Sequence, residues 1–374
     1  MNTSDYIIYD KFGDTIERLE FSQNPNNPYY LSAGGWDGKF YLWSINLQQS
    51  STQKTTLKQN QSEIPDFEVV STQQIISFNL EEPIFCLCWK RNTNQILAGT
   101  PEGSLFHLDL ESSRFNKLTQ FETGLREILH YQDDLFDLII TGNYDGIIRL
   151  WDIRDFSSPK ASYDTNNCIY SMSLDNHILL IGMHNGLISF FNLQKLRFGI
   201  FQPEIVFESN FNHLLPIYSI SAFPNLEGFA CLCLEGKVSV VFTDFNPKLA
   251  ENSKKLAEND KNFIFRAHRK NDQSESFLVN QVKVNKIYGT FATCGGDGVL
   301  NIWDYVSRSR LKITNFPGNP PITALDFSLD GNIIAYACGD DWTEGHTLSK
   351  KIDTKIALKY LSNAEKMKKQ PVKI

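Results

Sequence analysis

The sequence predicts an all-β protein built from repeated hairpins. One twelve-residue pattern occurs three times, at residues 32–43, 141–152 and 293–304. Each copy contains an apolar segment, an Asp-Gly pair and a second segment with a tryptophan. Asp-Gly favours a two-residue hairpin turn because both central positions can adopt positive φ. A hairpin that recurs along one chain predicts a repeat architecture.

Weaker copies of the hairpin fill the gaps between the three clear ones. These weaker copies keep the glycine of the turn but lack the tryptophan at the end of the second segment. Counting both kinds of copy, the turn glycines are Gly38, Gly103, Gly146, Gly186, Gly236 and Gly298. Their spacing of about 40 residues or more suits one four-stranded unit. Seven short apolar runs suit inner strands, at residues 16–21, 84–89, 125–130, 169–174, 217–222, 279–284 and 322–327. The repeat resembles that of WD40 β-propellers, and the count implies seven blades.

The two chain ends are expected to meet. Residues 355–360 are predicted to form the third strand of the last blade. Residues 6–9 are predicted to add the outer strand of that blade and so protect an exposed edge. Residues 1–362 are therefore predicted to form a single propeller. It carries a mobile polar insertion at 46–74 and a polar loop at 246–262, and a basic tail follows at 363–374.

The composition excludes several classes of protein. The net charge of −7, from 36 basic and 43 acidic residues, argues against a protein that mainly coats nucleic acid. No apolar run approaches the roughly 20 residues of a membrane span, and the first residues lack the pattern of a signal peptide. We expect a soluble intracellular protein. The seven cysteines fall in strand-like runs without zinc-site spacing, which favours buried reduced thiols.

The sequence contains no recognisable catalytic motif, so we expect neither an enzyme nor a cofactor or metal. Asp340-Asp341 lacks neighbouring ligands and is interpreted as a surface turn. In blade six, His268 is expected to join Thr293, Asp297 and Trp303 in a structural hydrogen-bond network. Asp37, Asp145 and Asp297 are interpreted as turn formers, which report on the fold and not on the function.

Several segments resemble two related propeller families more closely. The segments are 234–240, 263–269 and 288–298, and they resemble both the mRNA export factors of the nuclear pore and the mitotic-checkpoint propellers. Both families bind GLEBS segments, which are short peptides with critical glutamates. Residues 330–337, 341–346 and 361–365 resemble the export factors, whereas 180–186 resembles the checkpoint family.

The resemblance implies a non-enzymatic docking scaffold. It would bind a GLEBS-containing nucleoporin, support mRNA export, and reside in the nucleus and at the nuclear pore with cytoplasmic shuttling. RNA or a messenger ribonucleoprotein is a further partner that it implies. Residues that match the families' partner-binding positions are Trp36, Lys237, Arg266 and Arg269. Lys237 stands where the families have arginine, so its contact has no bidentate fork.

Two alternatives remain open at the level of sequence. The first is a spindle-checkpoint propeller that binds GLEBS motifs of kinetochore kinases. The second is a substrate receptor of a cullin-type ubiquitin ligase, whose adaptor would be a partner. This second alternative rests on residues 150–154, where Trp151, Asp152 and Arg154 match a short receptor motif, but the interpretation favoured for Arg154 is an ion pair within its blade.

Overall fold

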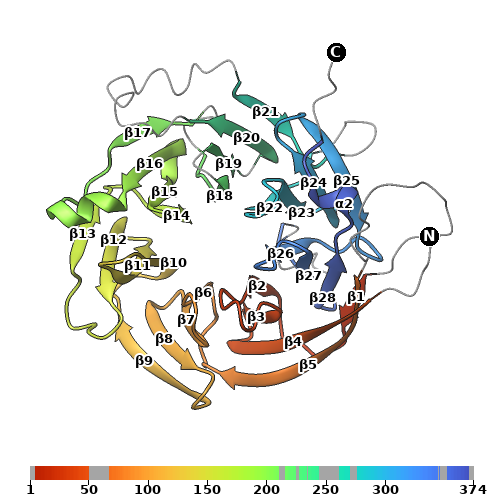
Figure 1. Ribbon diagram of the computed structural model, residues 1–374, viewed down its shortest axis with the longest axis horizontal. Coiled ribbons are helices and arrows are strands. Elements are labelled where there is room, and N and C mark those ends of the chain that lie inside the picture. The colour runs from red at the N-terminus through yellow and green to blue at the C-terminus, as the bar shows by residue number, and fades with distance from the viewer. Residues whose placement is uncertain are drawn as a thin grey trace.

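A computed structural model shows seven four-stranded antiparallel sheets arranged around a central channel (Figure 1). The structure describes residues 5–49, 67–209, 215–224, 227–233, 235–243, 261–269, 276–343, 345 and 352–369. The seven-bladed propeller predicted from the repeat is confirmed. The same pattern runs through every blade, from an inner strand at the channel to an outer strand at the rim.

The blades are numbered here in chain order. Blade 1 contains β2 (Ile16–Phe21), β3 (Tyr30–Gly35), β4 (Lys39–Gln49) and β5 (Phe67–Asn79). Blade 2 contains β6 (Cys86–Trp89), β7 (Gln95–Gly99), β8 (Ser104–Asp109) and β9 (Arg114–Gln120). Blade 3 contains β10 (Leu125–Gln132), β11 (Asp137–Asn143), β12 (Ile147–Asp152) and β13 (Ala161–Asp164). Blade 4 contains β14 (Ile169–Asp175), β15 (Ile178–Met183), β16 (Leu187–Asn192) and β17 (Ile205–Glu208), with the short 3-10 helices η1 (His184–Gly186) and η2 (Leu193–Phe198).

The remaining three blades complete the ring. Blade 5 contains β18 (Ser219–Ala222), β19 (Gly228–Leu232), β20 (Lys237–Phe242) and β21 (Phe263–Arg266). Blade 6 contains β22 (Val279–Val284), β23 (Phe291–Gly295), β24 (Val299–Asp304) and β25 (Ser309–Asn315). Blade 7 contains β26 (Ile322–Phe327), β27 (Ile333–Cys338), β28 (Lys355–Tyr360) and, from the other end of the chain, β1 (Tyr6–Ile8). A single helical turn, α2 (Asn363–Lys366), follows β28.

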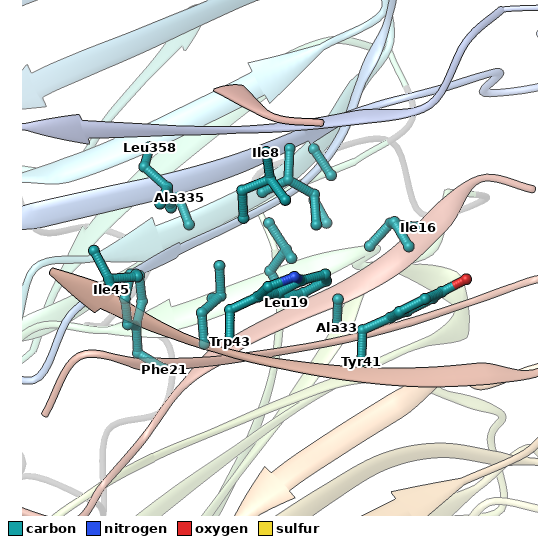
Figure 2. Close-up of a cluster of buried hydrophobic side chains, with 14 of the residues drawn as sticks. Ile8, Ile16, Leu19, Phe21, Ala33, Tyr41, Trp43, Ile45, Ala335 and Leu358 are labelled. Atoms are coloured by element: carbon teal, nitrogen blue, oxygen red, sulfur yellow. The ribbon is translucent and has the colours of Figure 1, made fainter. Parts of the chain in front are cut away.

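The N-terminal strand closes the ring as the sequence predicted. β1 pairs with β28, so that Tyr6 lies opposite Leu358 and Ile8 opposite Ile356. The strand ends at Ile8, one residue earlier than expected, and Tyr9 is exposed. At the seam, buried side chains of blades 1 and 7 form one apolar cluster, which includes Trp43, Leu358 and Ile8 (Figure 2).

Strands β4 and β5 run far into the segment expected to be a mobile polar insertion. Residues 46–49 and 67–74 form a paired two-stranded extension, and residues 50–66 lie outside the described part of the chain. Leu47 and Val69 pack against the apolar cluster of the seam, and the ring of Phe67 lies 5.9 Å from that of Tyr360. These contacts with blade 7 explain why a Gln- and Thr-rich segment continues as strand. The polar loop expected at 246–262 is described only at its last two residues.

The described part of the expected basic tail, residues 363–369, packs on the propeller. Ser362 and Glu365 form a capping box at α2. Lys366 is buried with its ammonium 5.2 Å from the ring centre of Tyr288, and Lys368 lies over Tyr305. Residues 370–374 lie outside the described part of the chain.

Candidate functional site

One position at or just before the start of each inner strand contributes to a ring around one end of the channel. It is the residue that follows the first apolar residue of each run, namely Glu17, Phe85, Arg126, Tyr170, Tyr218, Asn280 and Thr323, and all seven line one cavity. In blades 1, 3, 4, 6 and 7 the strand register shifts at this position. Such a bulge bends the strand and redirects one side chain. The ring therefore presents acidic, basic, aromatic and neutral polar side chains together at the channel mouth.

The cavity has a volume of about 410 Å³ and lies at the end of the propeller that carries the Asp-Gly turns. Aromatic side chains form much of its wall, and they are Trp36, Phe85, Tyr144, Tyr170, Tyr218 and Trp342. Trp36 meets Phe85 edge to face at 4.9 Å, and Tyr144 meets Tyr170 in the same way at 6.2 Å. Both tryptophans stay partly exposed, Trp36 at 42% and Trp342 at 45%.

Two reciprocal ion pairs cross the channel between blades 1 and 3. Arg18 of β2 pairs with Glu127 of β10, and Arg126 of β10 lies 3.5 Å from Glu17 of β2. The guanidinium of Arg126 also lies 5.4 Å from the ring centre of Tyr218 in blade 5. Three blades are therefore linked at the cavity. Because each arginine has a carboxylate partner, neither is available as a free anion-binding charge.

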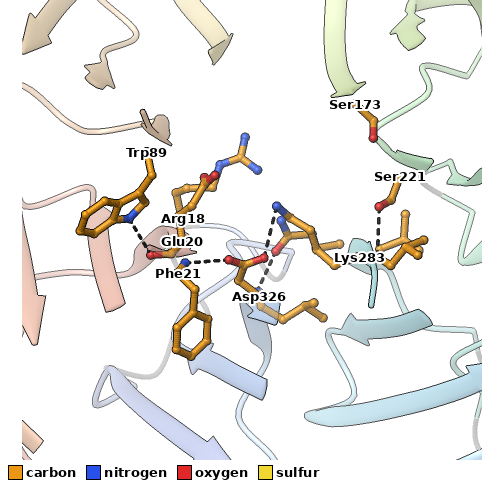
Figure 3. Close-up of polar contacts among 12 residues, drawn as sticks. Arg18, Glu20, Phe21, Trp89, Ser173, Ser221, Lys283 and Asp326 are labelled. Carbon is orange, nitrogen blue, oxygen red and sulfur yellow. Dashed lines mark hydrogen bonds and ion pairs between the residues drawn. The ribbon is translucent and has the colours of Figure 1, made fainter. Parts of the chain in front are cut away.

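Deeper in the channel, polar side chains join each inner strand to the next (Figure 3). Asp326 of blade 7 accepts a hydrogen bond from the backbone N–H of Phe21 in blade 1 at 2.8 Å, and its other oxygen lies 3.5 Å from Lys283 of blade 6. Ser221 of blade 5 accepts from the N–H of Val284 in blade 6. These bonds satisfy backbone donors that face the channel instead of a sheet neighbour.

Glu20 lies in the same part of the channel wall, close to Lys283 and Asp326 (Figure 3). Burial raises the pKa of its carboxyl to about 8, and the positive charges of Lys283 and Arg18 only partly oppose this shift. The channel therefore holds a carboxyl group that stays largely protonated at neutral pH. Nothing in its surroundings gives this group a substrate, and we interpret it as structural.

The structure places Trp36, expected to bind a partner, in the wall of the cavity. It directly precedes the Asp37-Gly38 turn of blade 1, and its indole N–H faces Glu17 at 3.4 Å. The other three candidates lie in and directly after blade 5, away from the cavity wall. Lys237 is the first residue of β20 and lies opposite Arg266 of β21, and Arg269 follows three residues later. Lys237 forms a 2.5 Å ion pair with Glu235, and Arg266 and Arg269 are exposed.

The network expected around His268 is present as a continuous chain. The ring nitrogens of His268 lie 2.8 Å from Asp297 and 2.9 Å from the hydroxyl of Thr293, and the indole N–H of Trp303 donates to that hydroxyl at 2.9 Å. His268 and Thr293 are fully buried. The arrangement fixes the segment after β21 against β23 and β24.

The two other turn aspartates have local partners. Asp37 accepts hydrogen bonds from the backbone N–H groups of Lys39 and Gly13 and from the Tyr41 hydroxyl. Asp145 accepts from the N–H of Ile147 and pairs with Arg149 at 2.8 Å. Each carboxylate is used to hold its own turn.

Cysteines behave as expected with one exception. Burial raises the pKa of the Cys86, Cys231 and Cys294 thiols well above the ordinary value, which makes them poor nucleophiles. Cys168 is exposed, contrary to the expectation that all seven are buried, because it lies in the turn before β14 and not within the strand. Among the described residues no cluster of His, Cys, Asp or Glu could hold a metal ion.

Sequence reasoning missed the cavity itself. Asp340 and Asp341, interpreted as a surface turn, lie in its wall beside Trp36 and Trp342. Aligning the seven inner runs would have revealed one strongly varied position within an otherwise apolar pattern.

Arg154, the basis of the ligase alternative, is exposed and donates to both carboxylate oxygens of Asp152 at 2.8 and 2.6 Å. In the described part of the chain no helix is long and apolar enough to cross a membrane.

Comparison with known proteins places these features in a family context. Residues 310–343 match the model of the WD domain, G-beta repeat. The mRNA export factor rae-1 of Caenorhabditis elegans is 24% identical, over 99% of this chain and 91% of its own. The spindle assembly checkpoint protein bub3 of Schizosaccharomyces pombe is 27% identical over 92% and 94%. The mitotic checkpoint protein BUB3.1 of Arabidopsis thaliana is 32% identical over 55% and 58%. The chain therefore forms a seven-bladed β-propeller that contains a recognised WD40 repeat, and it is similar to mRNA export factors and to mitotic checkpoint proteins.

Proposed function

We propose that this propeller is a non-enzymatic docking scaffold that binds a GLEBS-type segment of a nucleoporin and supports mRNA export at the nuclear pore. Relatives named as mRNA export factors, matched over most of both chains, support the choice of pathway. The observation that carries the binding mode is the pair Lys237 and Arg266, which lie opposite each other on neighbouring strands at the turn end of blade 5.

The cations of blade 5 suit a peptide with glutamates. Two positive charges on adjacent strands can each face one carboxylate, and charge-assisted hydrogen bonds are the stronger kind. Lys237 is engaged by Glu235, but both side chains are substantially exposed, at 30% and 42%. An exposed pair of this kind contributes only about 0–1 kcal/mol. An incoming glutamate could therefore replace Glu235 at little cost.

Trp36 supplies the apolar contact at a distance from these charges. It directly precedes the turn of blade 1, whereas Lys237 directly follows the turn of blade 5, so both lie at the same end of the propeller. Blades 1 and 5 stand on different sides of the ring (Figure 1). A segment that contacts both would run across the face in extended form. Exposed aromatic residues are common anchors in such interfaces.

A nuclear and nuclear-pore location with cytoplasmic shuttling belongs to this proposal, as does a messenger ribonucleoprotein partner. The tail contributes less to RNA binding than its composition indicated, because Lys366 is buried and Lys368 is held by Tyr305 and Glu227. If RNA is bound through other basic residues, the affinity should fall steeply with salt.

The experiment compares GLEBS peptides of a nucleoporin and of a checkpoint kinase by calorimetry with the full chain. We expect the nucleoporin peptide to bind more tightly, and Lys237→Glu to weaken it at least about tenfold, or 1.4 kcal/mol. Arg154→Glu is the matched charge reversal, because Arg154 is also an exposed partner of a carboxylate, Asp152, but follows β12, away from the turn end. Equal losses in the two variants, or no binding of either peptide, would refute the proposal.

The checkpoint function is the second candidate. The 32% identity with a checkpoint propeller over 214 residues favours it. A clear preference for the kinase peptide, together with kinetochore localisation of the tagged protein in dividing cells, would establish this candidate in place of the first. Localisation at the nuclear rim is the result expected for the export factor.

A further inference from the structure

The two most exposed of the six tryptophans lie at the same place on the propeller. The other four belong to strands and are buried or half-buried, namely Trp43, Trp89, Trp151 and Trp303. Trp36 and Trp342 instead lie between the second and third strands of their blades, are nearly half exposed, and line the same cavity. Because Trp36 belongs to blade 1 and Trp342 to blade 7, the pair flanks the seam where the ring closes (Figure 1).

The backbone of Trp342 has a conformation that suits few side chains. Its φ is 58°, in the left-handed region. Most of the other described non-glycine residues with positive φ are asparagines, which tolerate this region, and Trp342 is the only aromatic residue among them. A bulky residue with positive φ is an outlier, and such strained residues cluster at ligand-binding and switch sites.

Hydrogen bonds hold this strained segment and tie it to blade 1. The N–H of Trp342 donates to the Asp340 carboxylate at 2.8 Å, and the Trp342 carbonyl accepts from the N–H of Gly345 at 3.0 Å. The hydroxyl of Thr15, directly before β2, donates to the Asp340 carbonyl and accepts from the Asp340 N–H, both at 3.1 Å. The backbone is therefore fixed while the indole stays nearly half exposed. Preorganisation of this kind lowers the entropy cost of binding.

The charges beside the two tryptophans separate this place from blade 5. The described residues that line the cavity include four carboxylates and only two guanidiniums, and each guanidinium has a carboxylate partner. A glutamate of a bound segment would meet like charge here, whereas Lys237 and Arg266 would attract it at blade 5. The contact of such a segment with the tryptophans is therefore expected to be apolar.

We propose that Trp342 is a second apolar anchor for the segment that contacts Trp36, and that one apolar side chain of the partner packs against both indoles. This inference rests on the proposed function and adds to it a residue and a requirement. The partner segment carries glutamates where it crosses blade 5 and an aliphatic or aromatic residue where it crosses the seam of blades 7 and 1. Tryptophan is among the residues that most often dominate the binding energy of an interface.

The experiment uses the nucleoporin GLEBS peptide, the full chain and calorimetry. Trp342→Asn removes the indole but keeps the backbone, because asparagine tolerates positive φ. We expect it to weaken binding at least about tenfold. Its Tm should stay close to that of the parent protein, because relief of strain offsets the lost contacts of the ring, whereas a purely structural tryptophan would lower Tm and leave binding intact. Phe198→Ala is the matched control, because Phe198 is an exposed aromatic residue in η2, away from the turn end, and this variant should bind normally.

Variants of the peptide identify the side chain that makes the contact. Each apolar residue of the peptide is replaced by alanine in turn. One replacement should weaken binding to the parent protein but have little further effect on Trp342→Asn or on Trp36→Ala, because the contact is already lost in both.

Two results would overturn this inference alone. They are full affinity of folded Trp342→Asn, and the absence of any apolar peptide residue whose effect depends on Trp342. The proposed function would still stand in either case, provided that Lys237→Glu weakens binding. Failure of the peptide to bind the parent protein would overturn both.

Discussion

The hydroxyl of Thr293 connects His268 to Trp303 in the hydrogen-bond network of blade 6, and a single substitution can remove it. Asp297 accepts a hydrogen bond from one ring nitrogen of His268, which leaves the other nitrogen as the acceptor for Thr293. The Thr293 oxygen in turn accepts from the indole N–H of Trp303. One hydroxyl thus serves two partners.

Thr293→Val removes this hydroxyl with almost no change of shape. Thr293 and His268 are buried, so the ring nitrogen and the indole N–H are both left without a partner. Each buried polar group left unsatisfied costs about 1–3 kcal/mol, and two are left, so we expect the free energy of unfolding to fall by about 2–6 kcal/mol.

Blade 3 provides a matched control. Thr141 occupies the same position and is equally buried, but among the described residues its hydroxyl has one hydrogen-bond partner, Trp151, at 3.0 Å. Thr141→Val should cost about 1–3 kcal/mol, since one group is left without a partner. Urea unfolding followed by circular dichroism measures both, provided that tryptophan emission gives the same transition.

A double-mutant cycle tests the reasoning directly. Trp303→Phe removes the indole N–H, so Thr293→Val should cost less in that background than in the parent protein. The reasoning is refuted if Thr293→Val costs no more than Thr141→Val, or if its cost is the same in both backgrounds.

Three further predictions concern titration and closure. Burial would raise the pKa of Glu365, but Lys312, Lys359 and the Ser362 N–H hold it below its usual value, so that its stabilisation is present above about pH 4.5 and lost in acid. Glu365→Gln should therefore cost about 1 kcal/mol at pH 7, after allowance for solvent screening, and almost nothing near pH 3, as calorimetry at both pH values would show. Burial raises the pKa of Glu20, so the parent protein should lose stability as the pH rises towards 8, whereas Glu20→Gln should not. Melting curves of both proteins at pH 6 and pH 9 test this expectation. An equal change of Tm in the two proteins between these pH values would contradict it. Deleting residues 1–9 removes β1 and exposes the edge of β28, which should lower Tm by about 5 °C or more and promote self-association measurable by light scattering.

The fold could be predicted from the sequence because its signals are local and repeated. An Asp-Gly turn and its flanking strands lie within about a dozen residues, so Gly38, Gly146 and Gly298 reveal their hairpins without knowledge of the rest. Six such hairpins, together with seven apolar runs, then imply a closed ring of seven blades. The extension of β4 and β5 could not be predicted in this way. Its polar residues form strand because Leu47 and Phe67 reach blade 7, which is adjacent only after the ring has closed.

The cavity depends on contacts that no local pattern reveals. The positions that ring the cavity are single residues from seven separate blades, and they range from acidic to basic to aromatic. Asp341 looks like any acidic turn residue until the ring brings it beside Trp36. The partner-binding residues taken from the family resemblance, such as Lys237 and Arg269, remain predictions because binding depends on a molecule outside this chain.

The closing strand also has a consequence for the timing of folding. The residues that complete the last sheet, Tyr6 to Ile8, leave the ribosome long before their partners in β28, because about 350 residues separate the two strands. Each blade can pair its own hairpins during synthesis, but the ring cannot close until β28 has emerged. Such non-local pairing is slow, and until then the edges of the first and last blades are open to association with other chains. A nascent chain of this protein would therefore be most vulnerable in the interval between its last hairpin and the return of its first strand.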